Sequence, residues 1–482
     1  MSTSVGRVAK QASALAVLLG YLACVAAGSS AQQVSSPQHN QKPPDRRFLA
    51  ALAAYRAQQY ETAQKQLVPL VQSAPQNFEY NELLGLVYVA EGRHEQANPF
   101  LAKAVRLKPN EPEARTELAT NLLALHRNDE AEVQFKKAVA LQPAGYDANH
   151  NLGEFYIQAG KIANAVPYLK RAQVADPSTY NNGYDLALAL EQVGKLDDAR
   201  TQLEALIAKH ESAELHSLLG EVEEKSRNYV ASAAQYEQAA RLDPSEQNIF
   251  NWGAELILHQ TFTAAIEVFR AGTERFPQSA QLQNGLGIAL YGAGQTDDAV
   301  RAFLRASDMV PSDPLPLTFM GKACDGASPA IADQIRSRLQ SFLNRGSQSA
   351  ELDYCLATCL WRTNQTQLTP GLNNRVEALL KHASMLDPRY ADAYLELGNV
   401  YSDQHKYPEA IEAYEQAIKI DPNLANAHYR LGQALARSGN EARAQAELAT
   451  FERLRKSESD EKQKEQSQIQ QFVYTIRKAD AN

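Results

Sequence analysis

Small and apolar residues recur along this chain at helical spacing, in two blocks that repeat every 34 residues. The clearest copy covers residues 391–424, where a polar turn, DQHKYP, separates the two blocks. Residues three and four apart share one face of an α-helix, so each block predicts an amphipathic helix, and the short turn predicts an antiparallel pair. The marker residues of this copy are Tyr394, Leu397, Gly398, Tyr401, Ala410, Tyr414, Ala417 and Pro422.

Prolines mark the same period elsewhere in the chain. Proline lacks an amide hydrogen and disfavours helix at the residue before it, so it ends one helix pair and starts the next. The spacing predicts a single all-α array over residues 47–458, with about 12 repeats, in place of separate globular domains. Spacings of 34 residues separate Pro75, Pro109, Pro143 and Pro177 in succession, Pro277 from Pro311, and Pro388 from Pro422.

The residues at fixed offsets in each copy resemble the tetratricopeptide repeat. Leu84-Gly85 is followed by Tyr88, as Leu397-Gly398 is followed by Tyr401. Glycine or alanine at this point lets two helix axes approach closely. The resemblance implies a solenoid, a right-handed superhelix of antiparallel helix pairs. It also implies protein binding, with extended peptides or domains lying on an inner wall of first helices.

The period fails between Pro311 and Pro388, which lie 77 residues apart where two copies would span 68. We expect an irregular segment at 323–375, with an atypical second helix at 331–343 and a long loop at 363–374. Long loops on rigid scaffolds often carry function, and an insertion without function on a solvent-facing surface explains the same pattern equally well.

The first ten residues contain two basic ones, Arg7 and Lys10. An apolar run over 12–27 and a small-residue end at Ala31 follow. This pattern predicts a secretory signal peptide over residues 1–31, and the apolar run is shorter than a membrane-spanning helix requires. A weak lipoprotein pattern at Cys24 leaves lipidation there as an alternative, which would place the protein at the outer membrane. Residues 32–46 predict a flexible linker. We therefore expect an exported protein, periplasmic or secreted.

At the other end, residues 459–482 form a charged segment followed by an apolar helical face. A helix that caps the array explains it, and a contact helix for a partner is the alternative. The chain carries 48 basic and 56 acidic residues, a net charge of −8, and loss of Arg7 and Lys10 with the signal peptide makes it −10. This balance disfavours nucleic acid and anionic lipid as partners.

Enzymatic motifs are missing from the sequence. It contains no phosphate-binding glycine loop, no His-Glu-x-x-His and no nucleophile elbow, so we predict neither an enzyme nor a cofactor.

Three cysteines lie in the irregular segment. Cys355 and Cys359 share a helical face, so Cys324 is expected to form a disulfide with Cys355 or Cys359, or all three remain buried thiols. No metal is predicted, because His382 and His405 have no fixed spacing from these sulfurs.

The resemblance places partner-binding side chains at positions two, five and nine of each first helix. We predict a protein-binding scaffold or adaptor of the bacterial cell envelope, with partners of unidentified sequence. The alternative is a small-molecule or metal-binding module centred on the irregular segment. The candidate binding residues are Glu79, Glu82, Thr116, His150, Glu154, Tyr184, Ser217, Asn284, Lys322, Tyr354 and Asn399.

Overall fold

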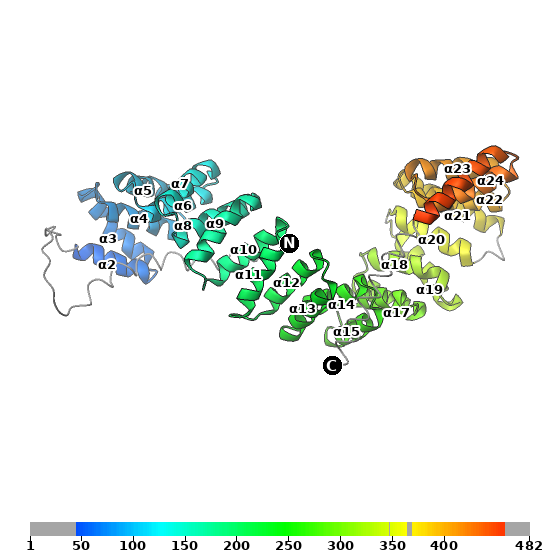
Figure 1. Ribbon diagram of the computed structural model, residues 1–482, viewed down its shortest axis with the longest axis horizontal. Helices are drawn as coiled ribbons and strands as arrows, with labels where there is room; N and C mark the ends of the chain where they lie inside the picture. Colours follow the sequence, from blue (N-terminus) through cyan, green and yellow to red (C-terminus); the bar gives the residue numbers. More distant parts are fainter. Residues whose placement is uncertain (1–44, 347, 364–368, 458–482) are drawn as a thin grey trace. The chain divides into compact units, whose positions relative to one another are not determined.

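The computed structural model describes residues 45–346, 348–363 and 369–457 of the 482-residue chain. Helices are the regular elements of these ranges (Figure 1). The chain divides into two compact units, the first ending at His210 and the second beginning at Glu211. The helices α2 to α24, with helical residues 441–457, make 24 helices or twelve pairs within the described ranges. The predicted all-α solenoid of antiparallel helix pairs is confirmed.

The first unit contains five pairs. They are α2 (Arg46–Arg56) with α3 (Tyr60–Ser73), α4 (Phe78–Ala90) with α5 (His94–Leu107), α6 (Pro112–Ala124) with α7 (Asn128–Leu141), α8 (Tyr146–Gln158) with α9 (Ile162–Ala175), and α10 (Tyr180–Gln192) with α11 (Leu196–Ile207).

The second unit continues the same arrangement. Its pairs are α12 (Ala213–Lys225) with α13 (Tyr229–Leu242), α14 (Glu246–Leu258) with α15 (Phe262–Arg275), α16 (Ala280–Gly292) with α17 (Thr296–Met309), α18 (Leu315–Ala323) with α19 (Pro329–Leu343), α20 (Ala350–Thr363) with α21 (Pro370–Leu386), α22 (Ala391–Asp403) with α23 (Tyr407–Ile420), and α24 (Ala425–Arg437) with residues 441–457.

Glycine sets the separation of the two helices within a pair. A Cβ added at Gly85 would lie 2.6 Å from Cδ2 of Leu101, and one added at Gly398 would lie 2.5 Å from Cε1 of Tyr414. Carbon atoms are in favourable contact only at about 3.5–4.0 Å, so a larger residue would push the pair apart. Leu101 and Tyr414 are each 1 % exposed, which shows that these contacts belong to the core.

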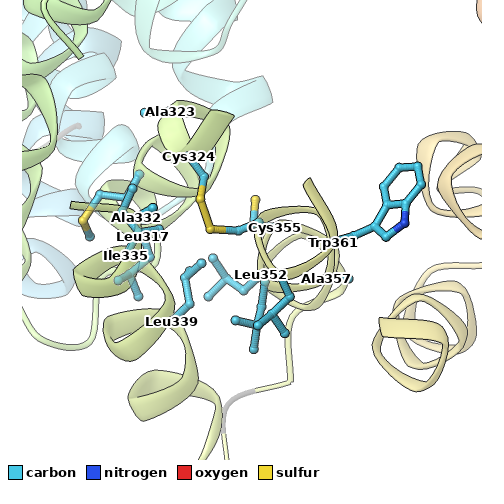
Figure 2. Packing of buried hydrophobic residues seen from close by; sticks show 14 of the residues in the cluster. Leu317, Ala323, Cys324, Ala332, Ile335, Leu339, Leu352, Cys355, Ala357 and Trp361 are labelled. Carbon is cyan, nitrogen blue, oxygen red and sulfur yellow. A yellow bond between two sulfur atoms is a disulfide. The ribbon is translucent and has the colours of Figure 1, made fainter. Parts of the chain in front are cut away.

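The irregular segment follows a short α-helix and begins with an added 3₁₀ turn. Helix α18 spans nine residues and is followed by η1 (Cys324–Gly326) before α19 begins. Ser328 N donates to Asp297 Oδ1 over 2.9 Å, which ties the turn to the start of α17. Figure 2 shows Leu317, Ile335 and Leu339 packed beside Leu352, so this segment shares one core with the regular repeats.

The prediction of a long loop at 363–374 is partly wrong. Thr363 is the last residue of α20, and α21 already begins at Pro370. The Thr369 side chain accepts a hydrogen bond from Leu372 N, and Pro370 stands at the start of the helix, where its missing amide hydrogen has no cost. Residues 370–374 therefore add a turn to α21.

The predicted signal peptide (1–31), Cys24, nearly all of the linker (32–46) and the capping segment (459–482) lie outside the described residues, so they stay predictions. Among the described helices, none combines the length and the apolar character that crossing a membrane requires.

Candidate functional site

The first helices of consecutive repeats in the first unit lie side by side. Helix α6 contacts both α4 and α8, and α8 contacts α10. Residues at positions two, five, six and nine of each helix share one face, since these positions are three or four residues apart. This row presents carboxylates from four successive repeats.

Glu82 on α4 and Glu117 on α6 are the most perturbed of these carboxylates. Burial, followed by the nearby Glu111 carboxylate, raises the pKa of Glu82 to about 8. Burial also raises the pKa of Glu117 well above its usual range, and the Glu82 charge raises it further. Oε2 of Glu117 is buried and has no hydrogen-bond partner. Burial and mutual repulsion therefore both disfavour the ionised forms of these two carboxyl groups.

The next two first helices also carry carboxyl groups whose pKa is raised by burial. Burial raises the pKa of Asp147 on α8, with a further contribution from Glu113 on α6. Burial raises the pKa of Asp185 on α10 to about 6, while the neighbouring His150 opposes the shift. We call Glu82, Glu113, Glu117, Asp147 and Asp185 the acidic face.

One cation lies at the edge of this face. Nζ of Lys108 is 3.0 Å from Oε1 of Glu79 and 4.0 Å from the centre of the Phe78 ring. Lys108 is therefore already engaged by Glu79, and its charge only partly offsets the repulsion at Glu82.

The structure places the other predicted residues of the first unit beside the acidic face, with local partners. His150 stacks on Tyr146 with ring centres 5.3 Å apart, and its Nδ1 lies 3.2 Å from Oδ1 of Asn182. Glu154 accepts a hydrogen bond from Gln158, and Thr116 donates to a backbone oxygen of its own helix. The Tyr184 and Tyr180 rings stack 6.2 Å apart.

Buried and surface positions are mixed among the predicted residues of the second unit. Asn284 is only 7 % exposed, so its side chain belongs to the interior and not to a surface for a partner. Ser217 donates to Asn248, and Lys322 lies 3.3 Å from Glu351.

Tyr354 and Asn399 are both engaged by neighbouring side chains. Tyr354 packs on Tyr390 with ring centres 5.1 Å apart. Asn399 accepts a hydrogen bond from the Tyr414 hydroxyl and donates to Glu396.

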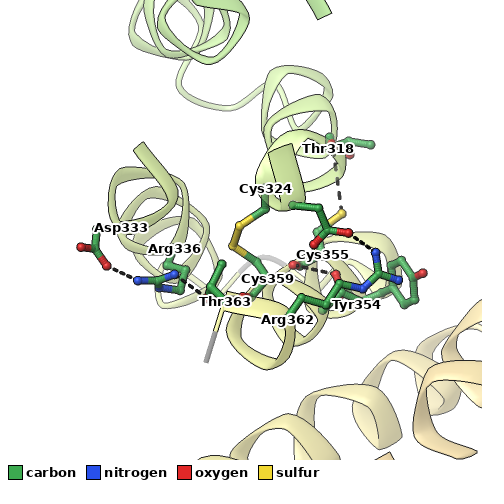
Figure 3. The surroundings of a disulfide bond; sticks show 11 residues. Thr318, Cys324, Asp333, Arg336, Tyr354, Cys355, Cys359, Arg362 and Thr363 are labelled. Atoms are coloured by element: carbon green, nitrogen blue, oxygen red, sulfur yellow. Dashed lines mark hydrogen bonds and ion pairs between the residues drawn. A yellow bond between two sulfur atoms is a disulfide. The ribbon is translucent and has the colours of Figure 1, made fainter. Parts of the chain in front are cut away.

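Two of the three cysteines of the irregular segment form a disulfide, and the third is a free thiol. Cys324 and Cys359 form a disulfide with Cα atoms 5.6 Å apart, one of the two pairings that the sequence allowed (Figure 3). Cys355 keeps its thiol, which donates to Thr318 O over 3.9 Å. Burial raises the pKa of Cys355 to about 12, so it is protonated near neutral pH. The segment therefore provides no set of thiolate ligands for a metal.

Arg362 links the irregular segment to the next regular repeat. Its guanidinium pairs with Asp325 of η1 and, over 2.6 Å, with Glu396 of α22, whose side chain is 6 % exposed. We call α18 to α22, joined by the disulfide and by Arg362, the clamped region. His382, once considered as a metal ligand, lies there with Nδ1 2.6 Å from Oδ2 of Asp353, and His405 contacts Tyr407.

Helix pairs that stack against their neighbours in a row define a class, the all-α helical-repeat proteins. Proteins of this class present extended surfaces for binding. A tetratricopeptide repeat model matches residues 48–112, 116–179, 184–246 and 259–314, which is more than half of the chain, and a second one matches 398–439. The chain belongs to the tetratricopeptide repeat family.

Individual relatives match over short stretches. Protein O-mannosyl-transferase TMTC3 of Mus musculus is 26 % identical over 196 residues, which cover 40 % of this chain and 17 % of that protein. The tetratricopeptide repeat and J domain-containing co-chaperone DNJ1 of Cryptococcus neoformans is 33 % identical over 75 residues, which cover 16 % of this chain and 14 % of that protein. The chain thus spans less than a fifth of the length of either relative.

Solved structures with a similar arrangement of helices include Naa15/Naa10 bound to HypK-THB. That match has a TM-score of 0.40 and 16 % identity, and covers 84 % of this chain and 68 % of the other. YrrB, a tetratricopeptide repeat protein with an unusual peptide-binding site, matches with a TM-score of 0.35 and 18 % identity, over 38 % of this chain and 94 % of its own.

Of the five residues of the acidic face, only Glu82 is among the binding residues predicted from the sequence. Glu113 and Asp147 stand at position two of their helices, one of the positions that were considered. Glu117 and Asp185 stand at position six, which was not among the positions that the resemblance assigns to binding. The available signal was the i, i+4 spacing of Glu113 and Glu117, which puts both on one side of α6.

Proposed function

We propose that this protein is an exported, non-enzymatic scaffold of the bacterial cell envelope that binds basic, extended segments of partner proteins on the acidic face. The observation that carries the proposal is the partial burial of Glu82 and Glu117 on adjacent first helices, where Lys108 offsets their repulsion only in part and Oε2 of Glu117 has no hydrogen-bond partner. A buried carboxylate is costly unless it is paired, and a lysine or arginine of a partner would supply the missing charge.

An extended segment suits this face better than a single small molecule. Glu82, Glu117, Asp147 and Asp185 come from four consecutive first helices, so a ligand must cross several repeats to contact them all. Each contact contributes modestly, and the affinity grows with the number of repeats engaged.

The proposed role includes no enzymatic activity. The similarity to the mannosyl-transferase covers 17 % of that protein, and the described part of this chain consists of helical repeats.

Export to the periplasm is the second part of the proposal. It is supported by the basic-then-apolar start of the sequence and by the buried Cys324–Cys359 disulfide, since such bonds persist in oxidising compartments. Expression of the whole chain in a bacterium, fractionation and N-terminal sequencing test it. We expect a periplasmic product that begins at Gln32, or a lipidated one that begins at Cys24. Cytoplasmic protein that retains residues 1–31 would contradict export.

The binding proposal is tested with untagged residues 32–482 and fluorescent peptides of equal length. We expect a lysine- and arginine-rich peptide to bind, with affinity that falls as salt rises, and an acidic peptide not to bind. The variant Glu82→Gln/Glu117→Gln should weaken binding at least about tenfold, as expected when charged contacts are lost. The control Glu95→Gln/Asp129→Asn replaces the same number of carboxyl groups by amides on exposed second helices and should bind like the wild type.

Proton release gives an independent readout. Because the pKa of Glu82 is about 8, this group is largely protonated at pH 7, and a cation placed beside it would lower that pKa and expel the proton. Calorimetry in buffers of different ionisation enthalpy should therefore show proton release with the wild type and less with Glu82→Gln. Equal peptide binding by both double variants, without proton release, would refute the acidic face as the binding site.

A further inference from the structure

Helices α12 and α14 of the second unit bring together two glutamates and a histidine. Glu255 and His259 are four residues apart at the end of α14, and Glu224 approaches from the end of α12. Nε2 of His259 lies 3.1 Å from Oε2 of Glu224 and 3.3 Å from Oε1 of Glu255. One ligand atom from each of the three residues lies within 4.8 Å of the other two.

These separations fit the edges of a metal coordination sphere. Zinc binds histidine nitrogen and carboxylate oxygen at about 2.0–2.2 Å, so neighbouring ligand atoms at a tetrahedral angle lie about 3.4 Å apart. The two distances from His259 Nε2 are close to this value, and an ion between the three groups would need little movement of the side chains.

Burial favours an ion over the protein groups alone. The side chain of Glu255 is 5 % exposed, and its Oε1, which faces the cluster, has His259 Nε2 at 3.3 Å but no hydrogen bond of good geometry. Two carboxylates with a neutral imidazole carry a charge of −2. A divalent cation neutralises this charge, and such neutralisation matters most at a buried site that water reaches poorly. The Tyr229 ring packs on His259 with ring centres 4.2 Å apart and holds the imidazole in place.

We propose that Glu224, Glu255 and His259 bind a divalent transition metal, with Zn²⁺ the best fit to one nitrogen and two oxygen ligands. Three protein ligands leave a fourth position open, which water or a side chain of a partner protein would fill. The Glu224 side chain, at 28 % exposure, is the outermost ligand and marks the side from which the ion enters. The site lies in the second unit and is independent of the acidic face.

The test uses untagged residues 32–482, stripped with a chelator and titrated with ZnCl₂ by calorimetry. We expect one zinc per chain with a Kd below about 10 µM, a rise in Tm on binding, and much weaker binding of MgCl₂. Glu255→Gln and His259→Gln should each weaken zinc binding at least about 100-fold. Circular dichroism confirms that each variant is folded.

A second histidine–carboxylate pair in the same unit provides the matched control. His382 and Asp353 lie 2.6 Å apart, and no third ligand residue joins them among the residues that the structure describes, so His382→Gln should leave zinc binding unchanged. Cobalt in place of zinc should give visible absorption bands of a four-coordinate ion, which Glu255→Gln abolishes. No saturable zinc binding by folded wild type, or equal affinity in Glu255→Gln and His382→Gln, would show that the three residues form only a hydrogen-bonded cluster.

Discussion

Glu117 in the first unit and Glu396 in the second occupy the same position, position six, of their first helices. Glu117 belongs to the acidic face, where burial raises its pKa and Oε2 has no hydrogen-bond partner. The Glu396 side chain is buried, and Arg362 of the preceding repeat pairs with it and links it to the disulfide-bonded segment. The same helix position therefore holds a carboxyl group without a cationic partner in one repeat, which we propose a partner protein supplies, and a carboxylate paired with a guanidinium in the other.

The disulfide in the clamped region should have the largest effect on stability. The double variant Cys324→Ala/Cys359→Ala frees a segment with a sequence separation of 35, and the chain-entropy model gives a loss of about 3–4 kcal/mol. Hydrogen exchange followed by mass spectrometry should show faster exchange in α18 to α20, with little change in the first unit. Cys355→Ala keeps the disulfide and serves as control, and equal exchange in the two variants would contradict this role.

The acidic face should make the first unit less stable as pH rises. The folded pKa of Glu82 is raised to about 8, above that of the unfolded chain, so the folded state holds the proton more tightly and stability falls from about pH 4.5 to pH 8. The loss between pH 5 and pH 8 is about 3–4 kcal/mol for this group. Denaturant unfolding of the first unit at several pH values measures it.

Substitution at the acidic face supplies the control for this pH dependence. Glu82→Gln/Glu117→Gln should remove most of the slope and stabilise the first unit at pH 8, because no carboxyl group has to ionise there. Glu95→Gln/Asp129→Asn should leave the slope intact. A slope that survives in the first variant would place its origin elsewhere.

Arg362→Met tests the opposite use of the same helix position. It leaves the buried Glu396 carboxylate without its cation, which should destabilise the second unit by about 2 kcal/mol; the full cost of an unpaired buried charge is reduced because the Arg362 side chain is 39 % exposed. Adding Glu396→Gln to this variant should restore most of the stability. No recovery in urea denaturation would mean that Arg362 acts through packing alone.

The smallest effect is expected at Cys355, whose chemistry reports on the clamped region without changing it. Burial raises the pKa of this thiol to about 12, so at pH 8 alkylation should be at least about 100-fold slower in the folded protein than in denaturant. In Cys324→Ala/Cys359→Ala the same thiol should react faster, since the surrounding helices are less tightly held. Fast labelling of the native wild type would disagree with its burial.

The fold could be predicted because its signals are local. Pro75 and Pro109 mark the period, and Gly85 and Gly398 mark where two helices touch. The residues within one repeat therefore specify its helix ends and the contact between its two helices. The length of the loop after Thr363 was overestimated because Thr369 and Pro370 were not recognised as the start of a helix.

The candidate sites depend on neighbours that are distant in sequence. Cys355 and Cys359 share a helical face, so spacing alone left the disulfide partner of Cys324 open, and the orientation of α20 against η1 decided it. Glu224 lies beside His259 only because two first helices are near each other. No sequence motif in either helix predicts this contact.

The sequence by itself determined which residues form helices and how the pairs repeat, because propensity, periodicity and turn residues act over a few residues. Tertiary structure alone decided which charges are neutralised and which are not. Glu117 and Glu396 differ only in whether a neighbouring repeat brings a guanidinium within reach, and the energy of a charge depends on the water and ions around it in space.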